Sequence, residues 1–126
     1  MVTRVNTPSP PAGDGAFDID VESSPGHTVV TVSGEIDVFT APRLRQVLFD
    51  PVLCGRPRVV VDLDAVSFMD STGVGTLVAA RRWTLSRESA LALVCGPGPV
   101  LRLLGLVGLD KVFEIHDSVD AAVVDG

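Results

Sequence analysis

Hydrophobic and polar residues alternate over the first part of the chain, which is the pattern of strands that expose one face. Phe17, Ile19 and Val21 alternate with acidic residues, and the segment from Thr28 to Ser33 repeats the two-residue period. Residues 23–26, which include a proline and a glycine, predict the turn between them. The sequence therefore predicts two neighbouring, half-exposed strands.

After these strands, apolar residues recur at helical spacing in some segments and form short continuous runs in others. A helix is expected from Thr40, with Pro42 in its first turn, to about Asp50, because Pro51 ends or bends it. Six more elements, alternately strand and helix, are then expected at Val59 to Leu63, Thr72 to Arg87, Leu91 to Cys95, Val100 to Leu106, Val112 to Ile115 and Asp117 to Val124.

This order of elements predicts one α/β domain over residues 17–126, with a small mixed β-sheet covered mainly on one face by helices. Residues 1–16 are rich in proline, glycine, serine and threonine. They are expected to form a flexible N-terminal tail without a regular element.

The middle of the chain joins a buried strand, an acidic turn and a pair of hydroxyl residues at the start of a helix. Asp62 and Asp64 are predicted to lie at the strand end and in the turn. Asp70, Ser71 and Thr72 are all residue types that cap helices, so capping alone accounts for them. The other interpretation is a modification site, because a phosphate on Ser71 would face unpaired backbone amides and the positive end of the helix dipole.

Three sequence blocks resemble the anti-sigma factor antagonists, also called STAS domains. The first is GEID at residues 34–37, followed by Thr40 and Ala41, which is similar to the family's strand-to-helix signature. The second, FMDSTGVG at residues 68–75, resembles the phosphorylation loop. The third, GLVGL at residues 105–109 followed by Val112 and Phe113, resembles the C-terminal passage from helix to strand. Together the blocks keep the family's order and spacing over most of residues 28–124.

The resemblance implies a role for each residue of a small site. Ser71 would be the phosphoacceptor, and Asp37 would lie near it at the partner-binding edge. Asp70 and Gly73 would shape the turn. Thr72 stands where a second serine is common in the family, which makes it a minor alternative acceptor. The expected partner-binding surface thus consists of these five residues.

Two glycines fall in the first turn of the helix that follows Asp70, where glycine costs about 1 kcal/mol relative to alanine. Close packing against the sheet and access for a partner are both explanations. We expect access to Ser71 to be the reason for Gly73, and packing to be the reason for Gly75.

The resemblance also implies a non-enzymatic switch. The unphosphorylated form would bind an anti-sigma factor that is also a serine kinase, and this would release a sigma factor. Phosphorylation of Ser71 would end the binding, and a metal-dependent serine phosphatase would reset it. ATP and the metal ion would belong to these partners, so no cofactor is expected in this chain.

Composition limits the alternatives. The 126 residues are 46% hydrophobic and carry a formal net charge of −6, which fits one folded domain and argues against a nucleic-acid partner. No apolar run approaches the roughly 20 residues of a membrane span, and no secretory signal is visible, so a cytoplasmic location is expected. Cys54 and Cys95 have no metal-ligand neighbours at useful spacing and are expected to be free thiols.

Two other functions compete with the switch. Asp62 and Asp64 after an apolar strand resemble the first motif of haloacid-dehalogenase-type phosphatases, in which Asp62 would be the nucleophile and would work with magnesium. Lys111 is the only lysine and no two aspartates are adjacent, which counts against that chemistry. The second competitor is a STAS-like scaffold that binds a partner without phosphorylation, in which Ser71 is merely a capping residue.

Overall fold

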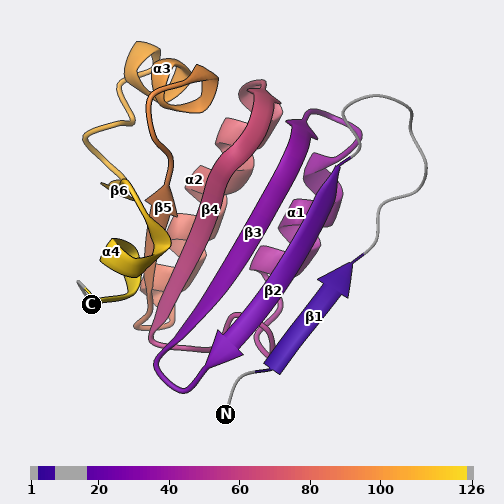
Figure 1. The fold of residues 1–126 in the computed structure, drawn as a ribbon, viewed down its shortest axis with the longest axis vertical. Coiled ribbons are helices and arrows are strands. Elements are labelled where there is room, and N and C mark those ends of the chain that lie inside the picture. The colour runs from indigo at the N-terminus through magenta and orange to yellow at the C-terminus, as the bar shows by residue number, and fades with distance from the viewer. Residues whose placement is uncertain (1–2, 8–16, 125–126) are drawn as a thin grey trace.

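The computed structural model describes residues 3–7 and 17–124 of the chain. Its ten elements are β1 (Thr3–Thr7), β2 (Asp18–Ser24), β3 (His27–Ile36), α1 (Ala41–Leu48), β4 (Arg58–Met69), α2 (Ser71–Ser86), β5 (Ala90–Val94), α3 (Pro99–Leu106), β6 (Glu114–His116) and α4 (Val119–Val124). The strands form one sheet in the order β1-β2-β3-β4-β5-β6 (Figure 1). The pairs β1-β2 and β2-β3 are antiparallel, and the remaining pairs are parallel. The predicted mixed sheet is therefore confirmed.

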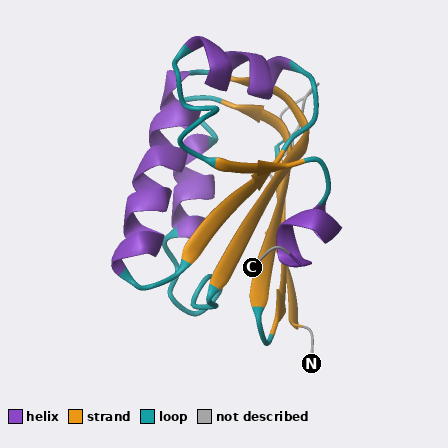
Figure 2. Cartoon of the chain, turned by 90° about the vertical axis from the view of Figure 1, so that its left-hand side faces the viewer, coloured by secondary structure: helices purple, strands orange, loops and turns teal. Residues whose placement is uncertain are grey.

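The helices lie mainly on one face of the sheet, as predicted. Figure 2 shows α1 and α2 together on one side and the short α4 on the other, while α3 crosses the end of the sheet. Val59 and Val61 of β4 point to the main core under α1 and α2, whereas Val60 points to a smaller core with Ala122 of α4. All three valines are fully buried, so β4 is apolar on both faces, as a central parallel strand requires.

The first strand corrects one expectation. Thr3–Thr7 pairs with β2, with Val5 opposite Val21, whereas no regular element was predicted in residues 1–16. β-Branched residues at alternate positions suit this edge strand, but a single apolar residue gives too weak a pattern to detect. The predicted tail residues 1–2 and 8–16 lie outside the described residues.

Strand β4 corrects a second expectation, because it does not end at an acidic turn. It runs for 12 residues, and Asp62 and Asp64 lie within it. Its register against β3 shifts twice, so that β4 accommodates extra residues in bulges. Gly34 of β3 lies beside the second shift with φ of 91°, a conformation that favours glycine. The long strand carries the chain to the edge of the sheet where α2 begins.

Candidate functional site

The site lies where two adjacent parallel strands end. Ile36 ends β3 and pairs with Met69, which ends β4. The amide of Asp70 donates to the carbonyl of Ile36 at 3.2 Å. Because parallel strands deliver their following loops to the same edge of a sheet, Asp37 and Ser71 come to neighbouring loops despite their separation in the sequence.

Asp70 caps helix α2. Its backbone is extended, and its Oδ1 accepts from the Thr72 amide at 2.9 Å and from the Gly73 amide at 3.4 Å. Ser71, the first residue of the helix, is exposed, and its hydroxyl has no hydrogen-bond partner among the described residues. Capping therefore explains Asp70 and does not explain Ser71.

The cap also changes the expected setting of a phosphate. The amides of Thr72 and Gly73 already donate to Asp70, so they are not available to a phosphate on Ser71 as the sequence led us to expect. A phosphate there would instead lie beside the carboxylate of Asp70. The helix dipole, which favours negative charge at this end, and the amide of Ser71 itself remain from that expectation.

Asp37 organises its own turn. Its Oδ1 accepts from the Phe39 amide at 2.9 Å and from the Thr40 amide at 3.1 Å, which is an Asx turn. Thr40 precedes α1 as predicted, but its side chain does not cap the helix. Its hydroxyl donates to the carbonyl of Glu35 at 2.8 Å and accepts from the Asp37 amide at 2.9 Å. The turn holds Val38 and Phe39 outward, 59% and 85% exposed.

An open groove of about 500 Å³ connects the two loops. We call it the α1–α2 groove; its lining residues are Val38, Ala41, Pro42, Arg45, Ser71, Thr72, Gly75 and Thr76. The groove thus brings both hydroxyl residues next to the apolar turn that Asp37 organises. Val38, Phe39 and Arg45 were missed at the sequence level, because nothing local indicates that α1 packs beside α2.

The roles expected of the two glycines were wrong, because Gly73 is the one that packs against the sheet and Gly75 is the open one. A Cβ at Gly73 would lie 2.6 Å from Met69 Cγ and 2.8 Å from Ile36 Cγ2, so Gly73 is buried and permits close packing. A Cβ at Gly75 would meet nothing within 4 Å. Gly73 therefore positions the start of α2 on the sheet, and Gly75 is the glycine that opens the groove.

Asp62 does not occupy the strand end that a phosphatase nucleophile would need. It lies in the interior of β4, where burial, reinforced by the charge of Asp64, raises its pKa while the Asp64 amide at 3.1 Å opposes that shift. Asp64 instead accepts from the Gly96 amide at 2.9 Å. Over residues 3–7 and 17–124, no three His, Cys, Asp or Glu side chains come together as a metal site would require.

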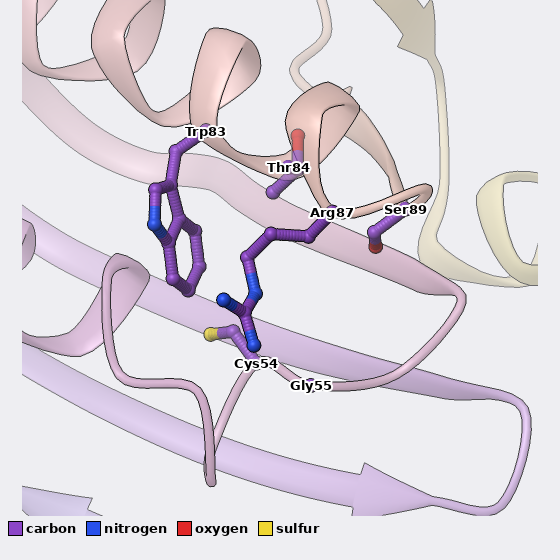
Figure 3. Close-up of a pocket in the computed structure, with 6 residues that line it drawn as sticks. All are labelled: Cys54, Gly55, Trp83, Thr84, Arg87 and Ser89. Carbon is purple, nitrogen blue, oxygen red and sulfur yellow. The ribbon is translucent and has the colours of Figure 1, made fainter.

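A second cavity, of about 80 Å³, lies at the opposite end of α2 (Figure 3). Arg87 extends past Trp83 toward Cys54, with its guanidinium carbon 4.9 Å from the centroid of the Trp83 ring. Burial is the main cause that raises the pKa of Cys54 to about 12, and Asp50 adds to it. The thiol is therefore protonated near neutral pH and is a poor nucleophile.

Comparison with known proteins supplies the family. The sequence model of the STAS domain matches residues 18–122. The anti-sigma-B factor antagonist of Listeria monocytogenes is 36% identical over 98 residues, which cover 76% of this chain and 84% of that protein. The chain belongs to the STAS domain family. The family that the sequence motifs predicted is therefore confirmed.

Solved structures agree with this assignment. An anti-sigma factor antagonist from Mycobacterium paratuberculosis superposes with a TM-score of 0.80 and 35% identity, covering 90% of this STAS domain and 97% of that chain. Phosphorylated SpoIIAA of Bacillus has a TM-score of 0.63 and 22% identity, over 85% and 96% of the two chains, and shares the fold. No helix in the described part of the chain has the length and apolar character to cross a membrane.

Proposed function

We propose that this STAS domain is an anti-sigma factor antagonist whose binding is switched off by phosphorylation of Ser71. Its unphosphorylated form binds an anti-sigma factor and thereby releases a sigma factor. Two similar proteins support the first part of the proposal, because the relative from Listeria and the structural neighbour from Mycobacterium both carry the name anti-sigma factor antagonist. SpoIIAA, which shares the fold, is known in a phosphorylated form and supports the second part.

The observation that carries the proposal is the unused hydroxyl of Ser71. Asp70 makes the cap, so helix stability does not require a serine at position 71. The hydroxyl is exposed on the wall of the α1–α2 groove, where a kinase can reach it. It lines the same groove as Val38, so a partner that fills this groove would cover both residues.

The phosphoryl transfer itself needs no catalytic group from this chain. The bond between the γ-phosphorus of ATP and the ADP oxygen breaks, a bond from phosphorus to Ser71 Oγ forms, and the hydroxyl proton passes to the kinase. We assign the kinase activity to the anti-sigma factor and the reset to a serine phosphatase, both acting in the cytoplasm. Thr72, also exposed, remains the minor alternative acceptor.

Phosphorylation would weaken binding through charge and desolvation. It adds roughly 1.5 to 2 negative charges beside Asp70, at a surface where a docked partner would exclude water. A partner fitted to a neutral hydroxyl would have to desolvate this charge without pairing it. The loss of binding should therefore be large, on the order of 2–5 kcal/mol for a buried unpaired charge.

The test compares three proteins in a titration with each candidate anti-sigma factor encoded in the same genome. Wild type should bind one of them, Ser71→Asn should bind nearly as well, and Ser71→Asp should lose at least tenfold in affinity. Asparagine matches aspartate in size, so the comparison isolates the charge. Equal binding by both variants would identify an unswitched scaffold, and absence of binding by wild type to any candidate would reject the antagonist function.

A further inference from the structure

Arg45 of α1 lines the same groove as Ser71. It is exposed, and it is the one charged side chain among the eight groove residues. Its guanidinium carbon lies 4.6 Å from the centroid of the Phe49 ring. Phe49 itself packs on Trp83, with ring centroids 5.2 Å apart, so the guanidinium is held one turn further along α1. An exposed guanidinium beside an aromatic ring keeps its charge and its N–H donors, and its long side chain can turn to another partner.

Among the described residues, no carboxylate forms an ion pair with Arg45. Neither α1 nor α2 contains an aspartate or a glutamate. Within the described residues Arg45 takes part in no ion pair, whereas Arg58 is paired with Glu114. In a chain with a net charge of −6, Arg45 is therefore a groove residue whose positive charge has no anionic partner among the described residues.

A phosphate on Ser71 would need such a donor. The amides of Thr72 and Gly73 already donate to Asp70, which leaves the amide of Ser71 in this first turn, and the Asp70 carboxylate would repel the phosphate. A guanidinium binds phosphate through two parallel N–H bonds and suits this geometry better than a single amide. The groove thus offers one group with the charge and the donors that the modified residue requires.

We propose that Arg45 binds the phosphate of phosphorylated Ser71 and is the positioning residue of the off state. The inference rests on the proposed phosphorylation of Ser71. To form the ion pair, the Arg45 side chain would turn from the Phe49 ring toward the start of α2, across the groove. The same surface that receives the partner would then be closed by an internal contact, and part of the repulsion from Asp70 would be offset.

The test uses the full chain with phosphoserine installed at position 71 by genetic encoding, and it follows the phosphate by ³¹P NMR as pH is varied. In low salt the second pKa of the phosphate should be about one unit lower with Arg45 present than in Arg45→Gln. The difference should shrink in high salt, because the groove is open to solvent. The matched control is Arg82→Gln, which removes an exposed arginine of α2 that does not line the groove.

Two further results of the same titration decide the role of Arg45. Arg45→Lys should restore part of the lowered pKa, because it keeps the charge without the planar donors. Equal phosphate pKa values in wild type, Arg45→Gln and Arg82→Gln would overturn the role of Arg45. Because the phosphoserine is installed directly, this result is independent of whether any kinase phosphorylates Ser71, so the failure of one proposal is distinguishable from the failure of the other.

Discussion

A single methyl group at Gly73 should destabilise the domain, whereas the same methyl group at Gly75 should not. Both glycines lie in the first turns of α2, so alanine gains about 1 kcal/mol of helix propensity at either position. At Gly73 the new Cβ would lie 2.6 Å from Met69 Cγ and 2.8 Å from Ile36 Cγ2, where ordinary contacts begin at 3.4 Å. Both neighbours are buried, with 6% and 0% exposure, so they have little room to move.

The comparison of the two variants isolates the steric cost. Inserting a methyl group into a packed core costs about 1–3 kcal/mol, and the propensity gain is common to both variants. Gly73→Ala should therefore be about 1–3 kcal/mol less stable than Gly75→Ala, and the latter should equal or exceed wild type. Urea unfolding followed by far-UV circular dichroism measures both, with the midpoints compared at unchanged m-value. Equal midpoints for the two variants would refute the packing role of Gly73.

Three more predictions concern polar groups that are buried or half-buried in the fold. The pKa of Asp62 is raised in the folded state, so its protonated form stabilises the fold at acid pH, and this contribution is lost as pH rises through the folded-state pKa. Asp62→Asn should therefore have a higher Tm than wild type at pH 7. The difference in Tm between the two proteins should be smaller at pH 4. Cys54 and Cys95, with pKa values raised to about 12 and about 11, should resist iodoacetamide at pH 8 until urea unfolds the chain. Arg58→Ala should cost about 2–3 kcal/mol in urea unfolding, because it strips Glu114 and a carbonyl of α4 of their donor.

Each of these has an outcome that contradicts it. A lower Tm for Asp62→Asn at pH 7 would mean that the carboxylate charge stabilises β4. Complete labelling of either thiol within minutes in native buffer would mean that the burial of that cysteine is transient. An unfolding midpoint of Arg58→Ala equal to that of wild type would mean that neither the ion pair with Glu114 nor the hydrogen bond to α4 contributes to stability.

The alternation of apolar residues predicted β2 and β3, and continuous apolar runs predicted β4 and β5, whose buried residues lie on both faces of the sheet. The predicted β4 was too short, because Asp62 and Asp64 have the composition of a turn. The structure keeps them in the strand through two bulges and through hydrogen bonds from the amides of Asp64 and Gly96. Such partners belong to the tertiary structure and leave no local pattern.

The candidate site, like the sheet, could be predicted from the sequence only in part. The motif at residues 68–75 identified Asp70 and Ser71, because their spacing before an apolar helix is a local property. Which glycine packs and which is open depends on Ile36, a residue of another strand. The groove itself, with Arg45 and Val38, exists only because α1 and α2 pack side by side over the sheet. Sequence reasoning therefore located Ser71, the proposed phosphoacceptor, but not the surface around it.

The proposed switch depends on the transfer of a phosphate from an anti-sigma kinase to Ser71. The most direct measurement incubates the protein with ATP and each candidate anti-sigma kinase, then applies intact and peptide mass spectrometry to wild type and Ser71→Ala. We expect one added phosphate, mapped to Ser71 and absent from the variant. A phosphate that maps to another residue, or none from any candidate that binds the protein, would contradict this expectation.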